Sequence, residues 1–326
     1  MTKPLLAWTV GEEDAGERLD RHLARRLDHS RHQIQGWIAD GRVHLNGARA
    51  KASRKLEAGE EVVCRPPEES PDPRLVPEDG PLHLLHEDDH LVILHKPPGI
   101  AIHPGAGRER GTLANYLLAR YPEMAAVGGP GRPGIVHRLD LDTTGVLAVA
   151  RSELAYRRLS TAFAERTVKK TYQAIGYGSP SKEADLIDLP IGRHRGDRKK
   201  MAVRRDGRPA RTHYRRVASA AGLSRFELDL ETGRTHQIRV HLKAIGHPLV
   251  GDPVYGEARW RNLERAHRKT LEGFPRPALH AWRLALQHPG SDQPVAFEAP
   301  VPEDMKTLWQ TVAGHPWQNE DVRSIR

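Results

Sequence analysis

Residues 134–150 have the sequence GIVHRLDLDTTGVLAVA, which sets an arginine and two carboxylates between two apolar runs. Arg138, Asp140 and Asp142 stand in the polar middle, and the apolar run after them predicts a buried strand. Reactive groups are often held on loops between buried segments, because the flanking elements give the loop a rigid frame. The alternative is that this loop only turns the chain, with Asp140 capping a turn near Thr143.

The chain of 326 residues is long enough for two domains, or for one large domain with an appendage. It has no run of about 18 apolar residues, so no transmembrane helix is expected. Its first residues make a poor signal peptide, and a cytoplasmic protein is expected. The single cysteine, Cys64, excludes an internal disulfide and a cysteine-based zinc site. No catalytic metal is expected from the 19 histidines, since His236 and His241 are five residues apart, which suits neither an HExxH helix nor a strand pair.

The formal net charge is +9, and the positive charge is concentrated in two stretches. Residues 18–55 contain ten Lys and Arg against three Asp, and residues 192–216 contain eleven against two Asp. The rest of the chain is therefore net acidic. A charge run is usually a solvated face, but this asymmetry favours a polyanionic partner, and so nucleic-acid binding, over a uniformly arginine-rich surface.

The first 66 residues predict a small α/β module of two short helices and a hairpin. Leucines at four-residue spacing (Leu19, Leu23, Leu27) predict a first helix with one apolar and one basic face. Ser30 is placed to cap a second helix. The pair Asn46-Gly47 is a strong signal for a two-residue hairpin turn. We expect the basic helix surfaces to face solvent.

Residues 67–81 are rich in proline with mostly acidic neighbours, which predicts a semi-rigid, extended linker between residues 1–66 and a large domain at 82–326. Beyond the linker, the apolar pattern predicts strands at residues 90–99, 145–151, 169–178, 211–219, 224–233, 278–289 and 294–300. Helical periodicity marks residues 152–166 and 234–246. The mixture indicates an α+β fold with a large, mainly antiparallel sheet.

Three segments of the large domain hold polar groups that need partners. The first is the Asp140 loop, the second places Tyr172 in an otherwise apolar strand, and the third runs into a helix that carries Arg234 and Arg239. A carboxylate buried among arginines stays ionised and oriented, as a nucleophile requires. On spacing alone, a structural role is supported about equally: a turn cap, a core tyrosine and a salt-bridging arginine.

The segment HRLDLDTTG, residues 137–145, resembles the catalytic motif of the RluA-type pseudouridine synthases, in which the Asp after Arg-Leu is the essential carboxylate. Further segments match this family in order and spacing: HKPPGIAIHPGAG, KKTYQAI, LETGRTHQIRVHLKAIGHPLVGDPVYG and ALHAWRLALQHP. The front module, with ERLDRHLARRL and SRHQIQGWIADGRVHLNG, resembles an S4 RNA-binding domain. The resemblance covers about residues 16–305 and is greatest to the RluD branch, which modifies a stem-loop of large-subunit rRNA.

The resemblance implies an isomerase that breaks the N1–C1′ bond of a uridine, turns the base and rejoins it through C5, with no cofactor. It implies a large mixed, mainly antiparallel sheet with a catalytic cleft across its middle, preceded by the S4 module. Asp140 is then the nucleophile or base at the ribose; attack on C1′ and removal of the C2′ proton both remain open. Tyr172 would stack on the uracil, and Arg239 would pair with Asp140 and keep it charged, with Arg234 as the alternative.

The resemblance further implies that RNA is the partner, in large-subunit rRNA or ribosomal precursor particles, of a protein active in ribosome biogenesis. A monomer is expected. Arg138 is the expected intruder that replaces the flipped uridine, since a stacked base is out of reach. The full set of expected RNA contacts comprises His137, Arg138, Arg234, Arg198, Lys199, Lys200, Arg18, Arg21 and Arg31.

Two alternatives belong to other functional classes. The first is a non-enzymatic RNA-binding or ribosome-assembly protein, which would not need Asp140, Tyr172 and Arg239 together. The second is a hydrolase that acts on RNA, which would require paired carboxylates or metal ligands. Asp142 could pair with Asp140 only if the two side chains converge.

Overall fold

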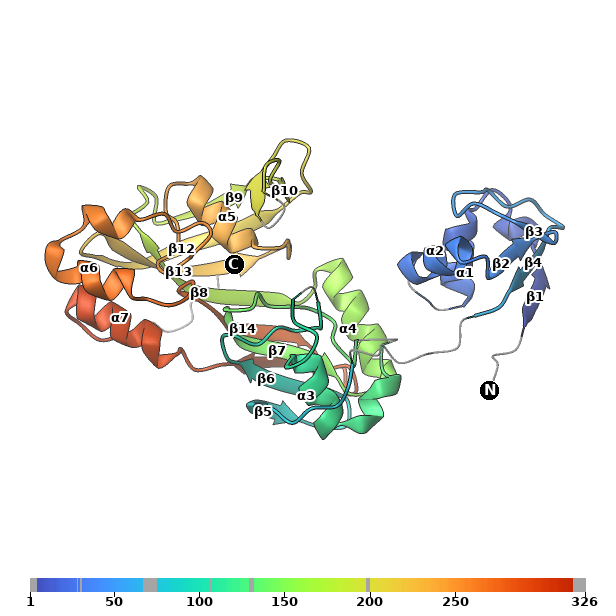
Figure 1. Ribbon diagram of the computed structural model, residues 1–326, viewed down its shortest axis with the longest axis horizontal. Coiled ribbons are helices and arrows are strands. Elements are labelled where there is room, and N and C mark those ends of the chain that lie inside the picture. The colour runs from blue at the N-terminus through green and yellow to red at the C-terminus, as the bar shows by residue number, and fades with distance from the viewer. Residues whose placement is uncertain are drawn as a thin grey trace. The chain divides into compact units, whose positions relative to one another are not determined.

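The computed structural model describes residues 5–27, 29, 31–66, 75–105, 107–128, 132–197 and 200–318, without the side chains of residues 32 and 33. The chain divides into two compact units, the front unit Met1–Pro71 and the large unit Asp72–Arg326 (Figure 1). Each unit has its own apolar core, so each is described by itself.

The front unit is a small antiparallel sheet with two helices. Its strands are ordered β1-β4-β2-β3. Its elements are β1 (Leu6–Thr9), η1 (Glu12–Asp14), α1 (Leu19–Arg26), α2 (Arg31–Ala39), β2 (Val43–Leu45), β3 (Ala48–Arg49) and β4 (Glu61–Cys64). Leu19 and Leu23 of α1 are fully buried, as their spacing predicts. Asn46 and Gly47 have φ of 49° and 74°, the pair of left-handed residues that a two-residue hairpin turn requires. The two helices and the hairpin predicted for this module are confirmed, whereas Ser30, the predicted helix cap, lies outside the described residues.

The basic face of α1 differs from the prediction, because Asp20 on this helix is fully buried. Its carboxylate accepts hydrogen bonds from Arg18 Nε at 3.0 Å, Arg31 Nη2 at 2.9 Å and Gln35 Nε2 at 2.7 Å. The hydrogen bond from Arg18, against the effect of burial, holds the pKa of Asp20 well below its usual value. Arg18 and Arg31 are therefore not free cations facing solvent, although their side chains stay 39% and 51% exposed. Arg21 is exposed, and no described carboxylate pairs with it.

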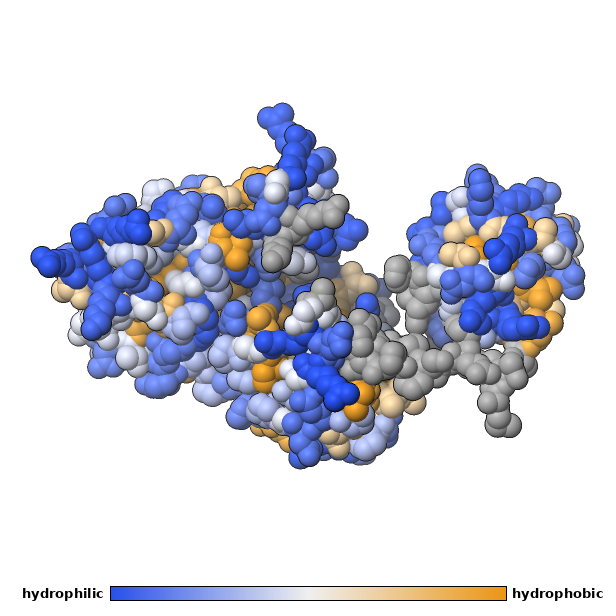
Figure 2. All heavy atoms as spheres, viewed as in Figure 1, coloured by the Kyte–Doolittle hydropathy of each residue, from blue (hydrophilic) through white to orange (hydrophobic). Residues whose placement is uncertain are grey.

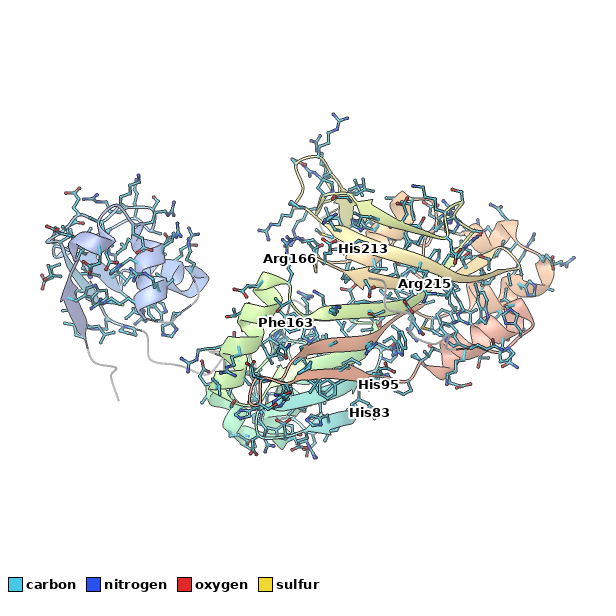
Figure 3. All side chains as sticks on the ribbon, turned by 180° about the vertical axis from the view of Figure 1, so that it is seen from behind. His83, His95, Phe163, Arg166, His213 and Arg215 are labelled. Atoms are coloured by element: carbon cyan, nitrogen blue, oxygen red, sulfur yellow. The ribbon has the colours of Figure 1, made fainter. Side chains whose placement is uncertain are left out.

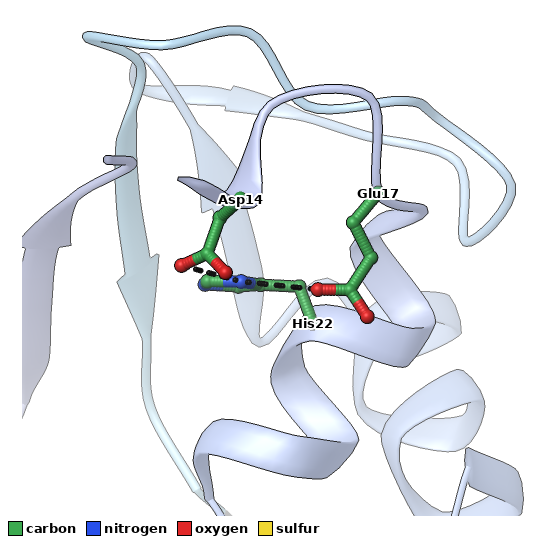
Figure 4. Close-up of side chains that lie close together, drawn as sticks. All are labelled: Asp14, Glu17 and His22. Atoms are coloured by element: carbon green, nitrogen blue, oxygen red, sulfur yellow. Dashed lines mark ion pairs between the residues drawn. The ribbon is translucent and has the colours of Figure 1, made fainter. Parts of the chain in front are cut away.

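A second polar cluster of the front unit joins Asp14, Glu17 and His22 (Figure 4). His22 Nδ1 lies 3.4 Å from Asp14 Oδ2 and 3.8 Å from Glu17 Oε2, and Arg25 pairs with both carboxylates. Trp8 Nε1–H donates to His22 Nε2 at 3.1 Å, so the neutral ring carries its proton on Nδ1. A protonated Nδ1 offers no lone pair to a cation. The cluster is therefore held by the ion pairs of Arg25 with Asp14 and Glu17, beside a neutral His22.

The large unit contains the remaining elements (Figure 1). Its strands are β5 (Leu84–Glu87), β6 (Leu91–Lys96), β7 (Thr144–Ala150), β8 (Lys169–Tyr177), β9 (Ala184–Asp188), β10 (Ile191–Arg193), β11 (Met201–Val203), β12 (Arg211–Ala220), β13 (Leu223–Leu230), β14 (Leu279–Gln287) and β15 (Pro294–Glu298). Its helices are α3 (Leu113–Arg120), η2 (Pro122–Ala126), α4 (Glu153–Glu165), α5 (Gln237–Ala244), η3 (Arg259–Asn262), α6 (Arg265–Glu272) and α7 (Glu303–Ala313).

Nine of these strands form one sheet. Eight follow the order β5-β6-β7-β14-β8-β13-β12-β9, and the ninth, β15, pairs with residues 283–287 of β14. All neighbouring strands of the sheet run antiparallel except β7 and β14. At that parallel crossing a Cβ on Gly145, which has φ 124°, would lie 2.1 Å from the Ala281 carbonyl oxygen, so no larger residue fits. The predicted α+β fold with a large mixed, mainly antiparallel sheet is confirmed.

Side-chain alternation along the strands builds a core on each face of this sheet. In β6, Val92 and Leu94 belong to the core on the face that carries α3 and α5, while Leu91 and Ile93 belong to the core on the α4 face. Farther along the sheet, α6 and α7 cover the α4 face over β8 and β13. On the side shown in Figure 2 the surface of the large unit is mostly hydrophilic, as expected for helices and strands that bury one face. No helix among the described residues is long and apolar enough to cross a membrane.

Part of the segment predicted as a linker contacts the large unit. Leu75 packs against the main core, and Asn115 Nδ2 on α3 donates to the Val76 carbonyl at 2.8 Å. The Glu78 carboxylate accepts a backbone N–H from the loop before α3 at 2.9 Å. Residues 75–81 are therefore held by side-chain contacts that proline content does not reveal, and the large unit begins before residue 82. Residues 67–74 lie outside the described residues.

Candidate active site

A pocket of about 90 Å³ lies on the α5 face of the sheet, where the central strands meet the start of α5. The lining residues are Arg138, Leu139, Asp140, Thr143, Tyr172, Leu230, Gly233, Arg234, Thr235, His236, Gln237, Ile238, Arg239 and Leu279. Asp140 is the one carboxylate among these described lining residues, so the paired carboxylates that a hydrolase would need do not converge here.

Asp140 stands in a tight turn that leads into β7. The Thr143 N–H donates to the Asp140 carbonyl at 3.2 Å, and Leu139 anchors the turn in the main core. The Asp140 side chain is 20% exposed and points into the pocket, where Arg239 Nη1 donates to its Oδ2 at 3.2 Å. The hydrogen bond of the turn thus uses the backbone carbonyl of Asp140, and its side-chain carboxylate remains available to a ligand.

Arg239 is held by a second carboxylate behind the pocket. Its Nε and Nη2 donate to the two oxygens of Asp252 at 2.7 and 2.9 Å, a two-pronged contact that fixes the plane of the guanidinium. Asp252 is itself buried and accepts the backbone N–H groups of Val254 and Tyr255. Burial alone lowers the pKa of Arg239, but hydrogen bonds and charge from Asp252, with Asp140 adding to them, raise it above its usual value. A permanent cation therefore faces Asp140.

Tyr172 and His236 complete the wall around Asp140. Tyr172 lies on β8, and its burial, with the charge of Asp140 adding to it, raises the pKa of its phenol above the usual value. It is therefore a neutral, ring-bearing donor at neutral pH. His236 precedes α5 in a left-handed conformation with φ 57°, and its Nε2 lies 4.0 Å from Asp140 Oδ2.

Lys96, at the end of β6, holds the Asp140 turn in place through hydrogen bonds to backbone carbonyls. This fully buried ammonium donates to the carbonyls of Pro97 at 2.8 Å, Ile100 at 3.2 Å and Leu141 at 2.8 Å. All three of its N–H donors are used. Burial lowers the pKa of Lys96 to about 8, although the nearby carboxylates of Asp142 and Asp140 oppose the shift.

This lowered pKa predicts a pH-dependent contribution of Lys96 to stability. The pKa of lysine in an unfolded chain is about 10.4, so between roughly pH 8 and pH 10 the unfolded chain binds more protons here than the folded chain does. The contribution of this group to the free energy of unfolding therefore rises with pH. Relative to Lys96→Met, the wild-type chain is expected to gain about 2 kcal/mol across this range. Urea unfolding at each pH measures the difference between the two proteins, and a constant difference would contradict the prediction.

The structure brings together most of the residues singled out from the sequence. Arg138, Asp140, Tyr172, Arg234 and Arg239 all line the pocket. Arg239, and not Arg234, lies against Asp140, while Arg234 Nε donates to the Pro209 carbonyl at 3.1 Å. Of the two arginines that the sequence left open as partners of Asp140, Arg239 is therefore the one that pairs with it.

His137 does not join this group, contrary to its expected RNA contact. The Ala148 N–H donates to His137 Nε2 at 2.9 Å, and the imidazole stacks on Phe163 of α4, labelled in Figure 3, with the ring centroids 4.5 Å apart. Burial, with the charge of Lys170 adding to it, lowers the pKa of His137 to about 3. A neutral ring that accepts a backbone hydrogen bond of β7 supports the turn and is not placed to hold a phosphate.

The expected RNA contacts of residues 192–216 are described only in part. Arg198 and Lys199 lie outside the described residues, and Lys200 Nζ lies 3.5 Å from Asp197 Oδ2.

Near the pocket, burial and then the charges of Arg166 and Arg208 lower the pKa of Arg234. Arg234 of the pocket therefore lies close to two further cations.

Three residues of the site were not predicted: Lys96, His236 and Asp252. Lys96 has a signal in its local sequence: a lysine that ends a mainly apolar strand has few polar neighbours in that strand, which indicates that it is buried. The spacing of His236 argues against a metal ligand and assigns it no role in catalysis, and Asp252, between a glycine and a proline, has the pattern of an ordinary turn. The contacts that bring each of them to the site, with Leu141, Asp140 and Arg239 respectively, join residues at least 13 positions apart, so spacing alone could not identify them.

Two parts of the chain match models of known families. Residues 90–244 match the family described as RNA pseudouridylate synthase. Residues 17–62 match the S4 domain. The first match contains Asp140, Tyr172 and Arg239, and the second contains both helices and the hairpin of the front unit.

Named relatives match nearly the whole chain. Ribosomal large subunit pseudouridine synthase D of Nitrosomonas europaea is 44% identical over 94% of this chain and 88% of its own length. The protein of the same name from Escherichia coli K12 is 41% identical over 97% of both chains. The uncharacterized RNA pseudouridine synthase YlyB of Bacillus subtilis is 42% identical over 92% of this chain and 95% of its own. Among solved structures, human RNA pseudouridylate synthase domain containing 1 superposes with a TM-score of 0.58 at 26% identity, over 77% of this chain and 94% of that one.

Proposed function

Because this chain belongs to the RluA-type family of RNA pseudouridine synthases and carries an S4 domain, we propose that it isomerises uridine in a stem-loop of large-subunit ribosomal RNA. The family, the enzyme class and the S4 module predicted from the sequence are confirmed. The rRNA target is supported by relatives that are named ribosomal large subunit pseudouridine synthase D and match nearly end to end. The net charge of +9 and the S4 domain suit a large polyanionic substrate.

The observation that carries the mechanism is the single carboxylate of the pocket, held against a permanent cation. Asp140 acts on the ribose: the N1–C1′ bond breaks, the base turns, C5 bonds to C1′, and the proton on C5 is replaced by one on N1. Arg239 keeps the carboxylate charged and oriented, and Asp252 keeps Arg239 in its plane. Tyr172 offers a ring on which the uracil stacks and a neutral hydroxyl near its edge.

Entry of the nucleotide requires that it leave its stack, which costs a few kcal/mol. Arg138 is exposed at the rim of the pocket, and we assign it the role of filling the vacated space. Arg234 and the neighbouring Arg166 and Arg208 supply positive charge for backbone phosphates, which offsets part of the cost.

The target is tested by mapping pseudouridines in the RNA of a strain that lacks this gene. Carbodiimide labelling and primer extension are applied to both rRNAs and to tRNA, after complementation with the wild-type gene or with Asp140→Asn. We expect one or more large-subunit rRNA positions to lose pseudouridine and to regain it with the wild-type gene alone. Loss confined to tRNA or to small-subunit rRNA would overturn the rRNA proposal and leave the enzyme class intact.

A further inference from the structure

His236 has a strained backbone at the wall of the pocket. Its φ of 57° lies in the left-handed region, which costs about 1 kcal/mol or more for a residue other than glycine. Such strain persists only where the surroundings hold it, and it is concentrated at functional sites. Here the conformation turns the imidazole back from the start of α5 toward Asp140.

The partner of the other ring nitrogen determines where His236 carries its proton. His236 Nδ1 lies 2.9 Å from the hydroxyl of Tyr255, and that oxygen also accepts the Met201 N–H at 2.8 Å. Tyr255 is buried, and a buried hydroxyl needs an acceptor for its own proton. Among the described residues, His236 Nδ1 is that acceptor, so the proton of the neutral imidazole is on Nε2. The burial of His236 lowers its pKa, although Asp140 opposes the shift, which agrees with a neutral ring.

Nε2 therefore carries the proton and lies near the Asp140 carboxylate, yet it does not reach it. The distance of 4.0 Å to Asp140 Oδ2 is too long for a hydrogen bond. If one oxygen lies at hydrogen-bond length from both atoms, the angle Nε2···O···Oδ2 at that oxygen is roughly a right angle. That oxygen must accept a proton from Nε2 and donate its own to the carboxylate. A hydroxyl group does both.

We infer that His236 and Asp140 together bind the ribose 2′-hydroxyl of the target nucleotide, which makes His236 a specificity-determining residue for RNA. The inference rests on the proposed role of Asp140 at the ribose. Whether Asp140 attacks C1′ or removes the C2′ proton, the hydroxyl on C2′ is attached to or next to the reacting carbon. The 2′-hydroxyl is both donor and acceptor, and DNA lacks it.

The test combines two variants with two substrates. His236→Asn retains a residue that tolerates the left-handed conformation but is too short to reach the hydroxyl, and His236→Gln keeps an N–H at about the distance of Nε2. The substrates are stem-loops that differ only in uridine or 2′-deoxyuridine at the target position. Single-turnover pseudouridine formation is measured for each pair, and thermal melting of each variant verifies the fold.

The wild-type enzyme is expected to act about tenfold or more slowly on the deoxy substrate, because two hydrogen bonds are lost. His236→Asn is expected to be about tenfold slower on uridine, with only a few-fold further loss on deoxyuridine, since the donor is already gone. His236→Gln should retain most of the wild-type discrimination. Equal deoxy penalties in wild type and His236→Asn, or a wild-type enzyme indifferent to the 2′ substituent, would overturn the inference. Wild-type turnover of the all-ribose stem-loop, and its absence in Asp140→Asn, test the proposed function separately.

Discussion

Asp140→Asn is expected to slow uridine isomerisation by at least about 10⁴-fold, in line with the loss of a nucleophile or general base in other enzymes. Asn keeps the size and the turn geometry of Asp, because the turn uses the backbone carbonyl of residue 140. It has neither the charge nor the reactive oxygen pair. RNA affinity and thermal stability should therefore change little. Release of tritium from RNA labelled at C5 of uridine measures the reaction, and filter binding measures the affinity.

Asp142→Asn is the matched control, since this carboxylate lies two residues away on the same turn and does not line the pocket. Its activity should stay within a few-fold of wild type. Added chelator should leave both proteins unchanged, which separates isomerisation from metal-assisted cleavage of RNA. Activity of Asp140→Asn within about tenfold of wild type would sink the assignment, as the remaining groups of the pocket cannot replace a nucleophile.

Asp252→Ala is expected to lower the free energy of unfolding of the large unit by about 3–5 kcal/mol, because it leaves a buried guanidinium with half of its carboxylate partners. The backbone N–H groups of Val254 and Tyr255 lose their acceptor at the same time. Activity should fall as well, since Arg239 is then free to rotate away from Asp140. Urea unfolding of the full chain reports on this unit through tryptophan fluorescence, because Trp260, Trp282, Trp309 and Trp317 all belong to it.

The contrasting variant is Asp206→Ala, which removes the partner of Arg204 in an exposed pair. It is expected to change the free energy of unfolding by less than about 0.5 kcal/mol, as surface ion pairs generally do. If the two variants destabilise the chain equally, Asp252 has no special part in holding Arg239. A stable Asp252→Ala with wild-type turnover would contradict the positioning role outright.

The sequence predicted several of the elements whose burial shows in their own pattern, but not α3 or α7, which also bury apolar residues at helical spacing. The long strands β8, β12, β13 and β14 carry apolar runs or alternation, and each was placed within a few residues of its observed bounds. Strand β9 and helix α6 were not predicted. β9 is a short edge strand with one buried residue, and α6 is almost wholly polar, so both are formed by contacts with distant segments and not by local pattern.

The residues of the site can be divided in the same way, into those with a signal in the sequence and those without one. Asp140, Tyr172 and Arg239 were found because a family motif marks them, and the structure then brought them into one pocket. Asp252 and His236 act through partners that the chain brings near only on folding. Asp20 is similar, because it stands on a helix predicted to have a basic solvated face and is buried against Arg31, 11 residues away.

The place of β14 in the sheet has a consequence for how the protein is made. This strand lies between β7 and β8, yet it begins more than 100 residues after β8 ends. During synthesis β7 and β8 therefore each keep one unpaired edge until β14 has been made. Unpaired edges are prone to aggregation, and pairing with a strand distant in sequence is slow. The front unit has its own core and folds first, as N-terminal domains generally do. A nascent chain thus gains its RNA-binding module early, and its pocket, walled in part by Leu279, exists only once nearly the whole polypeptide has been translated.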